Sequence, residues 1–196
     1  MKVVKSRVFT GITAVVFATV LVSGVAASSA QAGTTDTRNS TVTVTVEPYV
    51  SIKAAANATI TTNTTATTTG DVTVATNKTA GYTLSVKGNA ADTGNEASLK
   101  GQTASTEFIT PGASSDLTSA NLSAGTWGLG SAAATDAAFA NKLGALTDTN
   151  QTFKETSAAA PLPTGDTTTV TYGANVEGKS AQTYVGSVLW TAVTNS

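Results

Sequence analysis

The sequence predicts an all-β protein, an immunoglobulin-like or jelly-roll-like β-sandwich preceded by an N-terminal signal peptide. Three observations lead to this prediction. Short segments alternate strictly between apolar residues and threonine or serine, which is the period of a half-buried strand. Glycine and asparagine turns separate these segments. Threonine, which accounts for 37 of the 164 residues from Gly33 onward, suits a pleated surface that is partly exposed to water.

Residues 1–32 have the three parts of a secretory signal peptide. A short basic start precedes an apolar run from Val8 to Ala27, and the triplet Ala30-Gln31-Ala32 supplies small residues at positions −3 and −1. We expect cleavage after Ala32, which makes the protein secreted and associated with the cell surface. The alternative is an uncleaved anchor, because about 20 apolar residues can span a bilayer.

Residues 33–40 are expected to form a flexible segment and residues 41–196 the β-sandwich domain. Strands are predicted at Thr41–Val46, Tyr49–Lys53, Asp71–Thr76, Gly81–Lys87, Thr169–Val176 and Thr183–Val193, with short ones near Ile60, Leu99 and Phe108–Ile109. The predicted core shares their alternating phase and consists of Val42, Val44, Val46, Val72, Val74, Tyr82, Leu84, Val86, Val170, Tyr172, Val188 and Trp190.

Two segments depart from simple alternation. Thr183–Val193 is apolar on both faces, so it is expected to be a covered central strand or to meet another molecule. Within Thr135–Leu146, the residues Phe139, Leu143 and Leu146 follow helical spacing, which predicts a short helix. The prolines that follow predict an extended connector at Ala159–Pro163.

The amino-acid composition limits the partners and reactions that this chain can have. From Gly33 onward there are 8 basic and 12 acidic residues with no basic cluster, so we expect no nucleic-acid partner and, after cleavage, no membrane partner. The chain has no cysteine and no histidine. This excludes disulfides, lipid attachment through an N-terminal cysteine and histidine-dependent nucleophiles. We expect a protein that is not an enzyme, and no cofactor.

Without cysteine or histidine, the chain can offer a metal ion only oxygen ligands, so calcium is the metal to consider. Asp92–Glu96 and Asp148–Asn150 place carboxylates and amides at alternate positions. Neither loop matches the EF-hand pattern, and turn geometry explains such residues equally well, so no metal site is assigned. We nominate no catalytic pair among the carboxylates Asp71, Asp92, Glu96, Asp116 and Asp148. Six asparagines lie in Asn-x-Ser/Thr sequons, namely Asn39, Asn57, Asn63, Asn77, Asn121 and Asn150.

The candidate binding residues are Trp127, Gly128, Leu129 and Trp190. Trp127 stands among glycines, outside the predicted strands, where an exposed aromatic face could stack on a sugar or anchor an interface. Core filling is the alternative for both tryptophans. It is the favoured one for Trp190, which lies inside the last predicted strand.

Several segments resemble secreted surface proteins of small host-attached bacteria, most of them uncharacterised. The segments are Asn77–Leu84, Thr126–Gly128, Thr167–Val176 and Thr183–Asn195. The layout is also similar to the WxL cell-wall-binding domain, which has one Trp-x-Leu motif in mid-domain and another in the last strand. Trp127-Gly128-Leu129 matches the first motif, and Trp190-Thr191-Ala192 stands at the second with alanine in place of leucine. The resemblance implies non-covalent attachment to the cell envelope.

Three functions therefore compete. The first is a non-enzymatic surface protein that mediates envelope attachment or adhesion, with an envelope glycan, a surface protein or a second copy of the chain as its partner. The second is a self-assembling pilus or fibre subunit, in which Thr41–Val46 completes a neighbour's sheet by strand addition. The third is a carboxylate-based glycosidase.

Overall fold

The computed structural model describes residues 39–55 and 57–196. The chain divides into two units, residues 1–47 and 48–196. The predicted signal peptide, its cleavage site and residues 33–38 of the expected flexible segment lie outside the described residues. All the strands of the described chain belong to the second unit, which has no α-helix and a single 3₁₀ turn, η1 at Ser119–Asn121.

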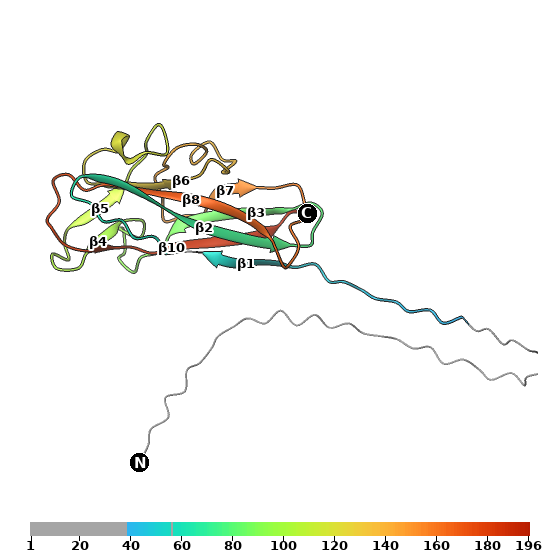
Figure 1. Cartoon of the computed structure of the whole chain (residues 1–196). Coiled ribbons are helices and arrows are strands. Elements are labelled where there is room, and N and C mark those ends of the chain that lie inside the picture. The colour runs from blue at the N-terminus through green and yellow to red at the C-terminus, as the bar shows by residue number, and fades with distance from the viewer. Residues whose placement is uncertain (1–38, 56) are drawn as a thin grey trace, which may run out of the picture. The chain divides into compact units, whose positions relative to one another are not determined.

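The second unit is an all-β domain of two sheets (Figure 1). The larger sheet has the order β1 (Val50–Ala55), β2 (Thr65–Thr76), β8 (Asp166–Asn175), β6 (Thr126–Gly130), β5 (Phe108–Pro111), β4 (Leu99–Gly101), β9 (Tyr184–Val185). The smaller sheet has the order β10 (Val188–Thr194), β3 (Tyr82–Gly88), β7 (Gln151–Glu155). Neighbouring strands are antiparallel except β5 and β6, which are parallel.

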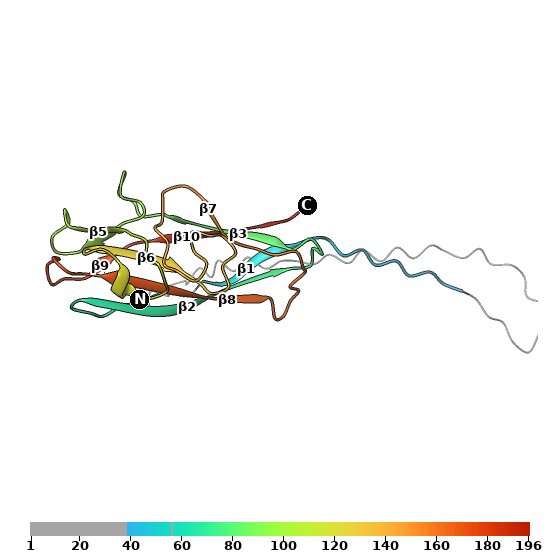
Figure 2. The ribbon, with the colours of Figure 1, turned by 90° about the horizontal axis from the view of Figure 1, so that it is seen from above.

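The core lies between the two sheets, with β2 and β8 on one side and β3 and β10 on the other (Figure 2). The alternating pattern explains this arrangement, since every second residue of β3 is buried while the residues between are half-buried. The larger sheet contributes Val72, Val74, Leu129, Val170 and Tyr172, and the smaller sheet contributes Tyr82, Leu84, Val86 and Phe153. Val188 and Trp190 are half-buried and pack against this core. Nine of the twelve predicted core residues are thereby confirmed.

The three exceptions are Val42, Val44 and Val46, which were predicted to face the core from a strand at Thr41–Val46. No strand forms there, and the three side chains are 69%, 63% and 67% exposed. Alternation gives a segment one apolar face, but a strand also needs a neighbour for its backbone groups. Within the described part of the chain, no strand pairs with this segment.

The predicted helix at Thr135–Leu146 is also wrong, although Phe139, Leu143 and Leu146 are all buried as the spacing suggested. A single turn forms in which the Asp136 carbonyl accepts the N–H of Phe139 at 3.1 Å. The chain then passes through Asn141 at φ 57° and leaves the helical direction. The N–H of Leu143 reaches Asp116 O at 2.9 Å, so the segment becomes a loop held by other elements.

Smaller differences concern strand bounds. There is no strand near Ile60, and β2 begins earlier than predicted, at Thr65. The last predicted strand is divided into β9 and β10 at Gly186, where an added Cβ would lie 2.6 Å from Leu99 Cδ2. The short strands expected at Leu99 and at Phe108–Ile109 are confirmed as β4 and β5. Among the described residues no helix is long and apolar enough to cross a membrane.

Candidate functional site

The Trp127-Gly128-Leu129 motif forms the middle of β6 and lies in the core. Trp127 is 5% exposed, and its Nε1–H donates to the Ala97 carbonyl at 2.9 Å. Leu129 is fully buried. Gly128 is needed for packing, because a Cβ there would lie 2.5 Å from the Gly112 carbonyl oxygen. The expectation that Trp127 lies outside the strands with an exposed face is wrong, because β6 is an interior strand flanked by β5 and β8.

Trp190 lies in the other sheet, on β10, and is half-buried. Its ring meets Phe153 edge-on, with centroids 5.0 Å apart and planes at 83°. This is the structural role expected for it. The four candidate binding residues are therefore divided between two sheets, and they do not form one exposed surface.

Apolar side chains are exposed along the C-terminal strands instead. Val185 of β9 is 52% exposed, and Leu189 and Val193 of β10 are 40% and 58% exposed. Leu189 and Val193 point away from the core, because they alternate with the half-buried Val188, Trp190 and Ala192. The sequence predicted these two apolar faces for the segment. We call Val185, Leu189 and Val193 the outer row.

A polar network that sequence reasoning missed links the two sheets. The Tyr82 hydroxyl donates to Asp166 Oδ2 at 2.7 Å, and Lys154 Nζ lies 2.8 Å from the same oxygen. Lys154 also donates to Thr168 Oγ1 at 3.0 Å. The network joins β3 and β7 to β8 at sequence separations of up to 84 residues. No spacing in the sequence signals such a contact.

Burial, hydrogen bonds and the neighbouring charges set the pKa values of Tyr82 and Asp166 in this network. Burial and the neighbouring Asp166 carboxylate both raise the pKa of the Tyr82 hydroxyl. Burial also raises the pKa of Asp166, but hydrogen bonds from Lys154 and Tyr82 and the Lys154 charge outweigh it, so this pKa lies below its ordinary value. The network holds a protonated tyrosine against an ionised carboxylate, which is a structural arrangement.

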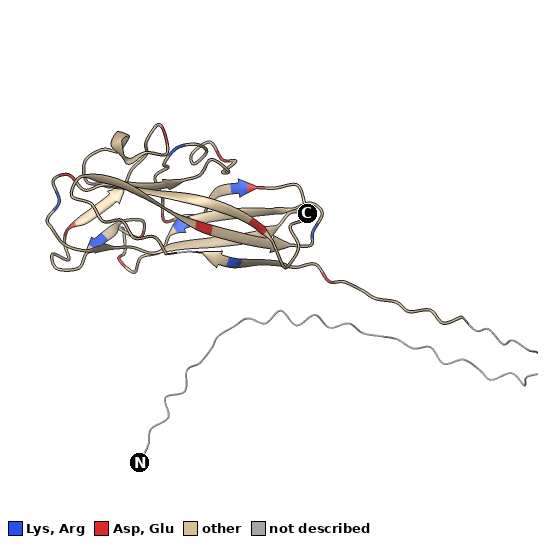
Figure 3. Ribbon diagram, in the orientation of Figure 1, with Lys and Arg blue, Asp and Glu red and all other residues tan. Residues whose placement is uncertain are grey.

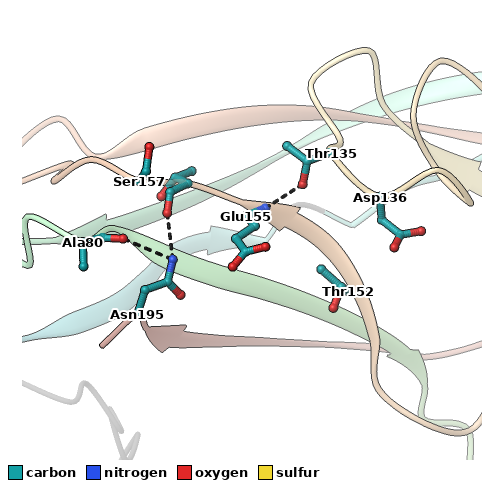
Figure 4. A pocket seen from close by; sticks show the side chains of 8 residues that line it. Ala80, Thr135, Asp136, Thr152, Glu155, Ser157 and Asn195 are labelled. Carbon is teal, nitrogen blue, oxygen red and sulfur yellow. Dashed lines mark hydrogen bonds between the residues drawn. The ribbon is translucent and has the colours of Figure 1, made fainter.

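An open hollow lies beside β7 (Figure 4). Asn195 closes one side, donating to the Thr156 carbonyl at 2.7 Å and to the Ala80 carbonyl at 3.2 Å. Asp136 and Glu155 both line it, and a glycosidase would need two such carboxylates. Asp136 Oδ1 accepts the N–H of Ala138 at 2.8 Å, so this carboxylate closes a turn. We assign no catalytic role to either residue.

Of the two loops considered for calcium, Asp92–Glu96 uses its carboxylates on neighbouring groups of the chain. Asp92 Oδ1 lies 2.5 Å from Lys100 Nζ. The Glu96 carboxylate accepts the N–H of Gly94 at 3.0 Å, and hydrogen bonds from backbone N–H groups lower the pKa of Glu96. Asp148 and Asn150 are exposed. No group of three or more acidic side chains that could hold a metal ion occurs in residues 39–55 and 57–196.

Comparison with known proteins adds no relative. No protein-family description, no curated protein and no solved structure matches this chain.

Proposed function

We propose that this chain is a secreted, non-enzymatic cell-surface protein that mediates envelope attachment or adhesion. We further propose that its two sheets form an immunoglobulin-like or jelly-roll-like β-sandwich. The observation that carries the attachment proposal is the outer row, because Leu189 and Val193 are exposed on one face of β10 and Val185 is exposed on β9, and exposed apolar side chains can form a contact surface. The dispersed lysines and acidic residues (Figure 3) support a partner recognised by shape and apolar contact.

The partner class follows from this surface. Leu189 and Val193 offer branched aliphatic groups and no aromatic face. Sugars stack best on aromatic rings, and Trp127, which could have supplied one, is buried. The outer row therefore favours a surface protein over an envelope glycan as the partner.

The test is sedimentation of the purified exported chain with isolated cell envelopes. The wild-type chain is expected to sediment with the envelopes, and Leu189→Ser combined with Val193→Ser is expected to stay in the supernatant. Thr191→Ser is the matched control, since Thr191 lies between the two on the same face of β10. Equal sedimentation of all three chains contradicts a role for the outer row, and no sedimentation of the wild type contradicts attachment.

A second candidate function is that of a self-assembling fibre subunit. The observation that favours it is the exposed segment Thr41–Val46, which pairs with no strand among the described residues. An extended segment with one apolar face can add to the edge of another molecule's sheet. Concentration-dependent association of the exported chain in sedimentation velocity tests this function.

A further inference from the structure

The domain has a long open strand edge in each sheet, and the two edges are neighbours. β1 ends the larger sheet and pairs only with β2, while β10 ends the smaller sheet and pairs only with β3. The two strands lie side by side (Figure 1). In the described part of the chain no hydrogen-bonded ladder joins them.

Apolar residues at this place are only partly covered. Val188, Trp190 and Ala192 of β10 face the core but remain half-buried, whereas β3, which has neighbours on both sides, buries its inward residues completely. Val50 and Ile52 of β1 are half-buried in the same way. We call these five residues the β1–β10 seam. They remain half exposed because each strand lacks a neighbour on one edge.

The other ends of the two sheets differ. On β7 the Phe153 carbonyl accepts the N–H of Thr135 at 3.1 Å, and the N–H of Glu155 donates to Thr135 Oγ1 at 2.8 Å. A loop thus covers this edge. β9, at the end of the larger sheet, has only two residues. Among the described strands, the open long edges with half-buried apolar residues are those of the seam.

The segment Thr41–Val46 fits the seam in pattern and length. Its valines would face the core and its threonines the solvent, and it carries no charge. Six extended residues span about 20 Å and the seven of β10 about 23 Å. Pairing would cover the three exposed valines and the half-buried seam residues together, and it would satisfy the outer backbone groups of β10.

We propose that Thr41–Val46 of one copy of this chain pairs with the free edge of β10 in a second copy, so that its valines cover the β1–β10 seam. This proposal rests on the second candidate function and names its donor and its acceptor. The exposed valines of one copy would then pack against the half-buried apolar residues of the seam in a second copy.

The first experiment measures association of the exported chain by sedimentation velocity. Val44→Asp is expected to weaken association by about 100-fold or more, because it would place an unpaired charge in the seam. Thr43→Asp is the matched control, expected to stay within about threefold because that side chain would face solvent. Both positions are exposed, so both variants should keep the wild-type unfolding midpoint.

The second experiment locates the acceptor. The chain has no cysteine, so chains with one introduced cysteine each can be mixed and oxidised. We expect Thr43→Cys or Thr45→Cys to form a mixed disulfide dimer with Thr191→Cys. The control is Thr152→Cys, exposed on β7 at the covered edge, which should form none.

The outcomes distinguish self-assembly as such from the particular donor segment and acceptor edge. A wild-type chain that stays monomeric at all concentrations overturns both the subunit function and the seam. Association that Val44→Asp leaves unchanged overturns the donor segment but not self-assembly. Association that is lost in Val44→Asp, with cross-linking to Thr152→Cys instead of Thr191→Cys, overturns the seam as the acceptor.

Discussion

Two segments of this chain share one alternating pattern but differ in whether their apolar residues are buried. Thr41–Val46 and β3 both alternate apolar and hydroxyl residues, yet β3 buries Tyr82, Leu84 and Val86 completely while Val42, Val44 and Val46 are exposed. The difference lies in neighbours, since β3 pairs with β10 and β7 on its two edges. Alternation therefore predicts which face of a segment is apolar, but not whether a sheet receives that segment.

The largest effect is expected where a fully surrounded strand holds a large side chain. Trp127→Ala should lower the free energy of unfolding by about 3–5 kcal/mol, because it opens a cavity in the core and leaves the Ala97 carbonyl without its donor. Trp190→Ala, on the open edge, should cost about half as much because Trp190 is half-buried. Urea unfolding of both variants measures this, and equal losses would mean that the β10 edge is as well covered as β6.

The comparison between the two alternating segments can be tested directly. Leu84→Ala should cost about 2–5 kcal/mol, as buried leucines do. Val44→Ala should change the free energy of unfolding of the monomer by less than about 0.5 kcal/mol, as exposed positions do. The measurement is urea unfolding at a concentration where the chain is monomeric. A loss at Val44 similar to that at Leu84 would show that the valines pack in solution.

Tyr82→Phe should cost about 1–3 kcal/mol, because it removes a hydrogen bond to a charged group. The raised pKa of Tyr82 stabilises the fold below about pH 10, and this contribution is lost as the pH rises further. The lowered pKa of Asp166 stabilises it above about pH 4, and this contribution is lost as the pH falls. Unfolding midpoints from pH 3 to 11 should fall at both ends, and Tyr82→Phe should show a smaller alkaline loss than the wild type, since Tyr172 and Tyr184, whose pKa values are also raised, remain.

Among the substitutions within the two sheets, the smallest effect is expected at a half-buried threonine of β3. Thr83 Oγ1 donates to Asn195 Oδ1 at 2.8 Å, so Thr83→Ala should cost about 0.5–1.5 kcal/mol. Thr83→Ser keeps the donor and should lie closer to the wild type in thermal melts. If Thr83→Ala cost as much as Leu84→Ala, the assignment of inner and outer faces in β3 would be wrong.

The sequence predicts the parts of the fold in which pattern and pairing coincide. β3 alternates throughout, β1 alternates over Val50–Lys53 and β8 over Asp166–Tyr172, and each has a neighbour in its sheet. β6 was missed, since Thr126–Gly130 contains two glycines and is buried on nearly every residue, which leaves no alternation to see. β7 was missed because Phe153 is its only apolar residue.

The candidate site was harder to predict for a related reason. Trp127 looks accessible in the sequence because glycines surround it, but Gly128 and Gly130 admit backbone on the opposite face of β6, while Trp127 and Leu129 point into the core. The Tyr82, Asp166 and Lys154 network depends on which strands meet across the two sheets. The outer row could be predicted, because Leu189 and Val193 add a second apolar face to an alternating strand.

The loop that covers the edge of β7 has a consequence for growth and aggregation. A sheet with two open edges can add strands from other molecules at both edges without limit, which is how cross-β aggregates extend. Because Thr135 satisfies backbone groups on the β7 flank, the three-stranded sheet has a single flank left for another molecule. Under the pairing proposed above, contacts at that edge would join subunits one after another in a line, and the sheet would not widen at its β7 edge into an insoluble layer.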